Sequence, residues 1–272
     1  MSIFAPPSES ISKLQQNLNK MFRHQGKSRT LKHNLRIATV LSFVAGIVNV
    51  TGFLAFNQLT TNVTGHFALF IYDLARFEFW RGTVYFLYIF IFLFGSFLSS
   101  FLIEKFKENK KLNVFVWPTL IECLILIIIV ILNYFSVLQY PDLIVCALLF
   151  AMGVQNSFVT KISNAVVRTT HLTGLFTDLG IELSQLFFPK SYPDRSTIKS
   201  TIKLRIYIIS SFFLGGLIGA YFYLSLDFKL NTLILGVIIL ISSLFYDNLK
   251  YKFVNTKRKY NQKKTAEHLS RK

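Results

Sequence analysis

The sequence predicts an all-α integral membrane protein with about six transmembrane helices in two repeats of inverted topology, plus two short re-entrant or broken helices. Three observations lead to this fold class. Hydrophobic residues make up 52% of the 272 positions, and 29 residues are Phe. Six separate stretches are long and apolar enough to cross a bilayer, whereas a soluble domain would bury about one of them. The basic residues are distributed unevenly between the predicted sides of the membrane.

Each predicted span is an apolar stretch of roughly the length that a bilayer requires. A helix rises ~1.5 Å per residue, so about 20 residues cross a hydrocarbon core of ~30 Å. In chain order the stretches are Ile37–Phe56, Thr83–Ile103, Val114–Phe135, Leu143–Thr160, Ile206–Leu226 and Leu230–Tyr246.

The net charge of +17 arises from basic residues that are grouped along the chain. They form four blocks, at 13–36, 105–111, 161–205 and 250–272. Six crossings from a cytoplasmic N-terminus would place all four blocks inside, which leaves three basic residues outside. This asymmetry is typical of a bacterial cytoplasmic (inner) membrane protein with both termini in the cytoplasm. It favours contact of the tails with anionic lipid head groups over a nucleic-acid partner.

A repeated pattern divides the chain into four parts. Gly46 is followed three positions later by an Asn, as is Gly153, and in both copies a polar connector leads to a Thr-Gly pair. We therefore expect a membrane repeat at 36–135 and a second at 136–247, between cytoplasmic tails at 1–35 and 248–272. The first tail has apolar residues at helical spacing, which predicts a helix on the membrane surface.

The segments 63–80 and 171–188 are short for full spans, because charged residues soon follow their apolar residues. They are either re-entrant or broken helices that line a polar cavity, or complete spans in a protein that crosses eight times. Eight crossings would place the lysines at 105–111 outside, so the charges favour six. Three full crossings in each repeat imply inverted topology, with a site near the midplane where broken helices meet.

Small residues inside the spans predict close helix contacts, either within the chain or between copies in a homo-oligomer. The glycines that we expect to pack in this way are Gly46, Gly52, Gly95, Gly153, Gly215 and Gly219.

Polar residues inside the apolar stretches are the candidates for binding a small solute. An Asn in hydrocarbon needs a hydrogen-bond partner, and a carboxyl group near mid-membrane is a functional candidate by default. The alternatives are an Asn that bonds across a helix interface, and a protonated Glu that bonds to a neighbouring helix. The candidate residues are Asn49, Thr64, His66, Glu122, Asn156, His171, Thr173 and Asp178.

The repeated motifs resemble the YoaK-like family of bacterial polytopic membrane proteins, whose function is not established. The similar runs are 43–53, 62–65, 151–156 and 167–174, and the resemblance covers roughly 37–246. It implies a bacterial membrane protein with about six spans, and it implies no substrate or mechanism. Asn49 stands where the family pattern commonly has Asp, which weakens a case for a proton-coupling carboxylate in the first motif.

Two functions fit these observations. The first is a small secondary transporter or permease with a polar site between the repeats and an unknown substrate. The alternative is a non-transporting membrane scaffold or lipid-interacting protein. The sequence contains no P-loop, no HExxH, no GxSxG and no cluster of Cys and His, so we expect no enzymatic activity, no cofactor and no metal. Cys123 and Cys146 lie in predicted spans and are interpreted as small apolar side chains.

Overall fold

The computed structural model describes residues 31–106, 116–135, 140–163 and 167–244, and these residues form helices without any strand. Five helices are long and apolar enough to cross a bilayer, and a shorter apolar helix, Lys229–Leu244, follows them. This architecture confirms the predicted all-α membrane fold. In order, the elements are α2 (Leu31–Phe56), α3 (Thr64–Ala75), α4 (Phe79–Phe106), α5 (Val116–Tyr134), α6 (Pro141–Ile162), α7 (Leu172–Gln185), α8 (Arg195–Leu224) and η2 (Lys229–Thr232), the first turn of the final helix.

Three helices begin well before the apolar stretches that predicted them, and α2 does so by six residues, at Leu31 instead of Ile37. α4 begins four residues before Thr83, and α8 begins eleven residues before Ile206. The extra turns of α8 are polar, and Asp194 caps them by accepting a hydrogen bond from the Thr197 N–H at 3.1 Å. The predicted N-terminal surface helix, the C-terminal tail and the lysines at 107–111 lie outside the described residues.

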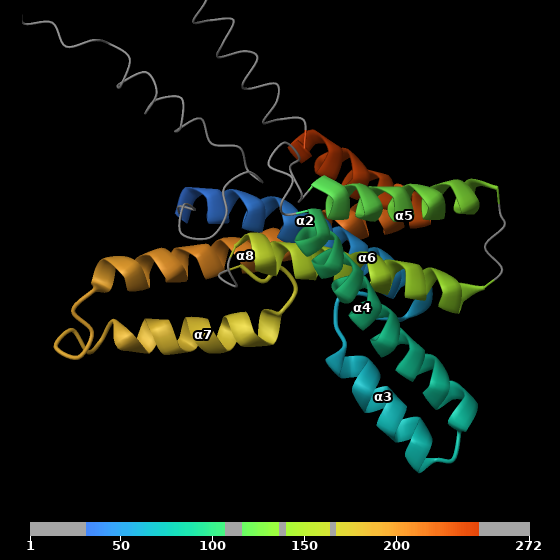
Figure 1. Cartoon of the computed structure of the whole chain (residues 1–272), viewed down its shortest axis with the longest axis horizontal. Helices are drawn as coiled ribbons and strands as arrows, with labels where there is room; N and C mark the ends of the chain where they lie inside the picture. Colours follow the sequence, from blue (N-terminus) through green and yellow to red (C-terminus); the bar gives the residue numbers. More distant parts are fainter. Residues whose placement is uncertain (1–30, 107–115, 136–139, 164–166, 245–272) are drawn as a thin grey trace, which may run out of the picture.

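The short helices α3 and α7 occupy the same place in the two halves of the chain. They have 12 and 14 residues, which correspond to about 18 and 21 Å, less than the ~30 Å that a bilayer requires. Each folds back along the helix that follows it, and the two resulting hairpins project from different parts of the central bundle (Figure 1). Their lengths favour the broken-helix interpretation over eight full crossings.

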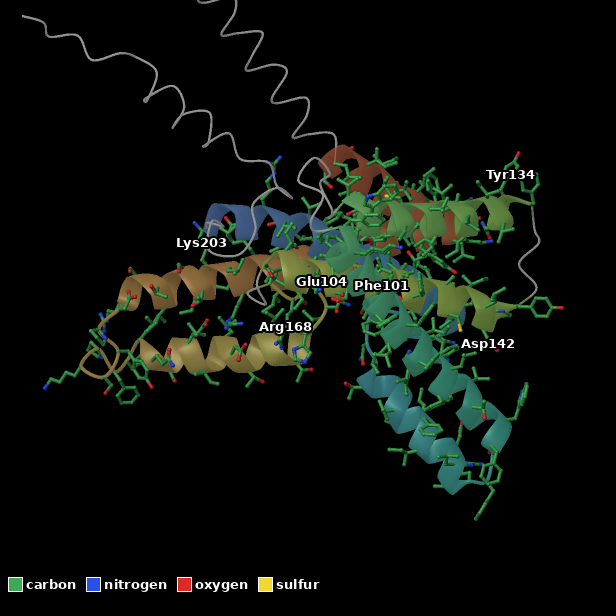
Figure 2. All side chains as sticks on the ribbon, in the orientation of Figure 1. Phe101, Glu104, Tyr134, Asp142, Arg168 and Lys203 are labelled. Atoms are coloured by element: carbon green, nitrogen blue, oxygen red, sulfur yellow. The ribbon has the colours of Figure 1, made fainter. Side chains whose placement is uncertain are left out.

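The first helices of the two halves, α2 and α6, run in opposite directions. α2 starts at the left of Figure 1, whereas α6 starts on the right, near Asp142 in Figure 2, and leads toward Arg168. A parallel repeat with eight crossings would give α2 and α6 the same direction. An inverted repeat requires the opposite directions that the structure has.

The core is built from two helix pairs, and each pair takes one helix from each half. α2 packs most extensively against α8, and α4 against α6. The helices of each pair are parallel: in the second pair Tyr88 of α4 bonds to Asp142, near the start of α6, and Glu104 bonds to Lys161, near its end. The two halves are therefore interleaved.

The same glycine contact recurs at both crossings. At each crossing a Cβ atom added to either glycine would overlap the backbone carbonyl oxygen of a Phe on the other helix, and that helix carries its own glycine three residues after the Phe. The contacts are Gly46 with Phe212, Gly215 with Phe43, Gly95 with Phe150 and Gly153 with Phe92. Only glycine allows backbones to approach this closely. Gly52 packs against Thr60, and Gly219 against Ile47 and Val50.

Replacing a crossing glycine should destabilise the protein, while the same change at an open glycine should not. Gly153→Ala would drive a methyl group into the backbone of α4, so we expect a loss of ~1–3 kcal/mol in the free energy of unfolding. Gly180 of α7 has nothing within 4 Å of an added Cβ, so Gly180→Ala should gain up to ~1 kcal/mol of helix propensity. Unfolding of both variants in detergent micelles measures the difference. Equal effects would contradict the close crossing.

Cysteine labelling in intact cells tests the inverted topology. With Cys123 and Cys146 replaced, an impermeant thiol reagent should label Tyr140→Cys, before α6, and Glu78→Cys, between α3 and α4. Lys199→Cys on α8 should stay unlabelled until the cells are opened, because both six and eight crossings place it in the cytoplasm. Labelling of none of the three in intact cells would favour eight crossings, provided that all three react after lysis.

Candidate functional site

A hydrogen-bonded pair joins the end of α2 to the connector that precedes α3. The Thr61 hydroxyl donates to Oδ1 of Asn49 at 2.8 Å. The neighbouring Thr60 is buried, and its hydroxyl donates to the carbonyl oxygen of Val48 at 3.2 Å. Thr60 also fits against Gly52, where a side chain would collide with it. The connector is thus fixed to the last turns of α2, and α3 begins three residues after Thr61.

The second half contains the same arrangement. Oδ1 of Asn156 on α6 accepts hydrogen bonds from the hydroxyls of Thr170 at 2.9 Å and Thr169 at 3.3 Å. α7 begins two residues after Thr170. We call these two arrangements the Asn–Thr clamps: Asn49 with Thr61, and Asn156 with Thr169 and Thr170. Both hold the N-terminus of a short helix against a long apolar helix.

Gln155 connects the second clamp to the other half of the chain. Its side chain is fully buried, and Nε2 donates to the carbonyl oxygen of Leu41 on α2 at 3.0 Å and to the Thr169 hydroxyl at 3.3 Å. Leu41 precedes Asn49 by eight residues, which is about 12 Å along a helix. The clamps therefore lie at different heights along α2, with a polar link between the repeats.

Several buried polar atoms near the clamps have no hydrogen-bond partner among the described residues. A polar atom buried without a partner costs about 1–3 kcal/mol, so such atoms are uncommon in folded proteins and point to an unseen partner. They are Ser42 Oγ and Thr51 Oγ1 on α2, and Gln155 Oε1 and Asn156 Nδ2 on α6.

A polar pocket of about 480 Å³ lies between α7 and α8, next to the second clamp. Arg168 and His171 line it on the connector that leads into α7, and Asp178 lines it further along α7. The His171 ring lies over the first turn of α7, where Gly174 leaves room for it. The pocket thus brings together two of the predicted site residues, His171 and Asp178.

Arg205 of α8 closes one side of this pocket with three charge-assisted hydrogen bonds. Its Nε and Nη2 atoms donate to the two carboxylate oxygens of Glu182 at 2.9 Å each, and Nη1 lies 2.9 Å from Oδ2 of Asp178. Asp178 and Glu182 therefore share one face of α7, because the same guanidinium group binds both.

The remaining predicted residues lie elsewhere. His66 is buried on α3, with Nε2 at 2.8 Å from the Leu59 carbonyl oxygen and its ring edge-on to Tyr88. Thr64 and Thr173 are exposed in the first turns of α3 and α7. Glu122 is fully buried on α5, and neither of its carboxylate oxygens has a partner among the described residues. None of these four lines the pocket between α7 and α8.

Sequence reasoning missed the threonine hydroxyls that complete the clamps. It also missed Gln155 and Arg205. A signal for the hydroxyls was available, because the pattern Thr-Thr-x-x-Thr-Gly occurs at both 60–65 and 169–174. Nothing in the sequence pairs Arg205 with acids some twenty residues before it. Cys123 and Cys146 are both free and buried. Within the described residues, no group of three His, Cys, Asp or Glu side chains is arranged to hold a metal ion.

Removing Arg205 should leave Glu182 as a poorly solvated, unpaired carboxylate, because only 14% of that side chain is exposed. We expect Arg205→Met to cost about 3–5 kcal/mol of unfolding free energy, and the double change Arg205→Met with Glu182→Met to recover much of it. Asp178→Asn should cost ~1 kcal/mol or less, since half of that side chain is exposed. Denaturant titration in micelles measures all three. Independent, additive effects at 205 and 182 would contradict the buried pair.

Comparison with known proteins places this chain in a family. The model of the family described as protein of unknown function (DUF1275) matches residues 37–246. The chain is also similar to the UPF0700 transmembrane protein YoaK of Bacillus subtilis (strain 168), with 25% identity over 187 residues, which cover 64% of this chain and 80% of that protein. No solved structure matches. The matched region contains both Asn–Thr clamps, the pocket, most of α2 and the other four long helices, so the chain belongs to the DUF1275 family of multi-pass membrane proteins.

Proposed function

We propose that this protein is a small secondary transporter or permease that moves a polar solute between its two repeats. Its activity is transport, without an enzymatic reaction. The observation that carries the proposal is the repetition of the Asn–Thr clamp immediately before each short helix. Broken helices that meet polar groups inside the membrane form the binding sites of inverted-repeat transporters.

The chemistry of the clamps supports a neutral or zwitterionic solute over a bare ion. Gln155 Oε1 is a buried acceptor and Asn156 Nδ2 a buried donor, and both lack a partner among the described residues. A solute with its own donors and acceptors would satisfy both atoms. The N-terminus of α7 beside them adds a partial positive charge that would favour an electronegative group.

The pocket between α7 and α8 suits an entrance to this site. It adjoins the second clamp through Arg168 and His171. The positive-inside distribution supports an orientation with this pocket on the cytoplasmic side of a bacterial inner membrane and both termini in the cytoplasm. Glu122 is buried on α5, away from the pocket lining, and serves as a candidate for a separate role in the transport cycle.

The alternative is a scaffold or lipid-interacting protein without transport. In that case Asn49 and Asn156 would only hold their connectors in place. Replacing them would then change stability and no solute-dependent property. This alternative would be favoured if every buried polar atom had a hydrogen-bond partner within the protein. The atoms near the clamps that lack a partner among the described residues favour a bound solute instead.

A solute screen on the purified protein tests transport. We expect at least one compound from a library of amino acids, sugars, nucleosides and organic acids to raise the thermal stability of the protein, and to exchange across proteoliposomes. Asn49→Leu and Asn156→Leu should abolish that exchange by removing the clamp acceptors, while the proteins remain folded.

Asn133→Leu is the matched control, because Asn133 also forms a side-chain hydrogen bond, to Asn231 at 3.0 Å, but lies outside the clamps and the pocket. Its exchange rate should stay within about twofold of the original protein. Exchange that survives in both clamp variants would refute the assigned site. Failure of every compound to exchange would favour the scaffold.

A further inference from the structure

The turn between α7 and α8 lies at one end of the molecule (Figure 1), and its aromatic side chains are exposed. The Phe187 side chain is 81% exposed, and those of Phe188 and Tyr192 are 62% and 41% exposed. Aromatic side chains gather in this way at membrane–water interfaces, where a ring can contact both acyl chains and head groups.

Basic residues occur beside and after these rings along the chain. Between positions 186 and 203 there are four basic side chains and one acidic side chain, a formal charge of +3. Three of the four, Lys190, Lys199 and Lys203, are exposed and form no ion pair with any described residue. Arg195 donates a hydrogen bond to the Leu186 carbonyl oxygen at 3.0 Å and so closes the turn. Lys203 lies on α8, about two turns after Arg195 (Figure 2).

The nearby acids are already engaged. Hydrogen bonds from Thr197 and Ser196 hold the pKa of the Asp194 carboxyl below its ordinary value, because this carboxylate caps α8. Asp178 and Glu182 both bind Arg205. No acid among the described residues pairs with the exposed lysines, so they produce a positive field that attracts external anions.

The corresponding turn between α3 and α4 is aromatic too, but its charges balance. Phe77 is 79% exposed and Trp80 is 82% exposed. Glu78 pairs with Arg76 at 3.1 Å and with Arg81 at 3.0 Å, and Asp73 supplies the second negative charge, so positions 73–81 have no net charge. The two turns thus share their aromatic character and differ in net charge. Anionic lipids attract basic segments on the cytoplasmic face of a membrane, so the difference matches the orientation given by the positive-inside rule.

We propose that the α7–α8 turn is a membrane-surface anchor, which inserts Phe187 and Phe188 between anionic lipid head groups while Lys190, Lys199 and Lys203 contact their phosphates. The partner is a lipid surface because the exposed rings and the unpaired cations occur together on a membrane protein. The anchor rests on the orientation of the chain and does not depend on transport.

A fluorescent probe on the turn tests the anchor in the full-length protein. With Cys123 and Cys146 replaced, Ser191→Cys carries an environment-sensitive fluorophore and leaves both Phe side chains intact. The protein is reconstituted into phosphatidylcholine vesicles with or without phosphatidylglycerol. Nitroxide-labelled lipid reports contact with the bilayer, and iodide reports exposure to water.

We expect lipid quenching at position 191 to be at least twofold stronger with phosphatidylglycerol, and to fall when salt is raised or when Lys190, Lys199 and Lys203 are changed to Gln. A probe at Phe79→Cys, on the charge-balanced turn, should contact lipid equally in both vesicles. Iodide quenching at 191 without lipid quenching would overturn the anchor. Lipid quenching that ignores phosphatidylglycerol would overturn the recognition of anionic lipid. Either result would leave the solute-exchange assay unaffected, so the two proposals fail separately.

Discussion

The close approach of backbones at two glycine crossings is the constraint on which the rest of the structure depends. Gly46 and Gly215 let α2 lie against α8, and Gly95 and Gly153 let α4 lie against α6. Lipid supplies no hydrophobic driving force between helices, so association relies on such packing. The crossings fix the long helices, and the clamps then fix where α3 and α7 begin.

Much of the fold could be predicted from the sequence, because apolar length and charge asymmetry are local signals. All five long helices fall on predicted spans. The starts of α4 and α8 were less accessible. The first turns of α8 are mostly polar and the first turn of α4 contains Arg81, and hydropathy does not report a helix that begins before its apolar stretch. The sequence also did not reveal which helices pack against each other. The Phe that precedes each crossing glycine by three residues is present in the sequence, but its carbonyl contact appears only in three dimensions.

The candidate site was predicted in part. Asn49 and Asn156 stood out because an amide inside an apolar run demands a partner, and both have hydroxyl partners from the following connector. The partners themselves required knowledge of how the connectors fold back. Glu122 stood out for the same reason as the amides, yet the structure gives it no partner among the described residues. Arg205 was missed because ion pairs between separate helices leave no pattern in sequence.

The interleaving of the halves has a consequence for biosynthesis. Gly46 and its crossing partner Gly215 are 169 positions apart in the chain. At a typical synthesis rate, roughly ten to thirty seconds pass between their emergence from the ribosome. During that interval α2 must remain in the membrane with its glycine surface against lipid or a chaperone. A nascent chain that stalls before α8 is complete would therefore expose this surface, which makes α2 a natural recognition element for membrane quality control.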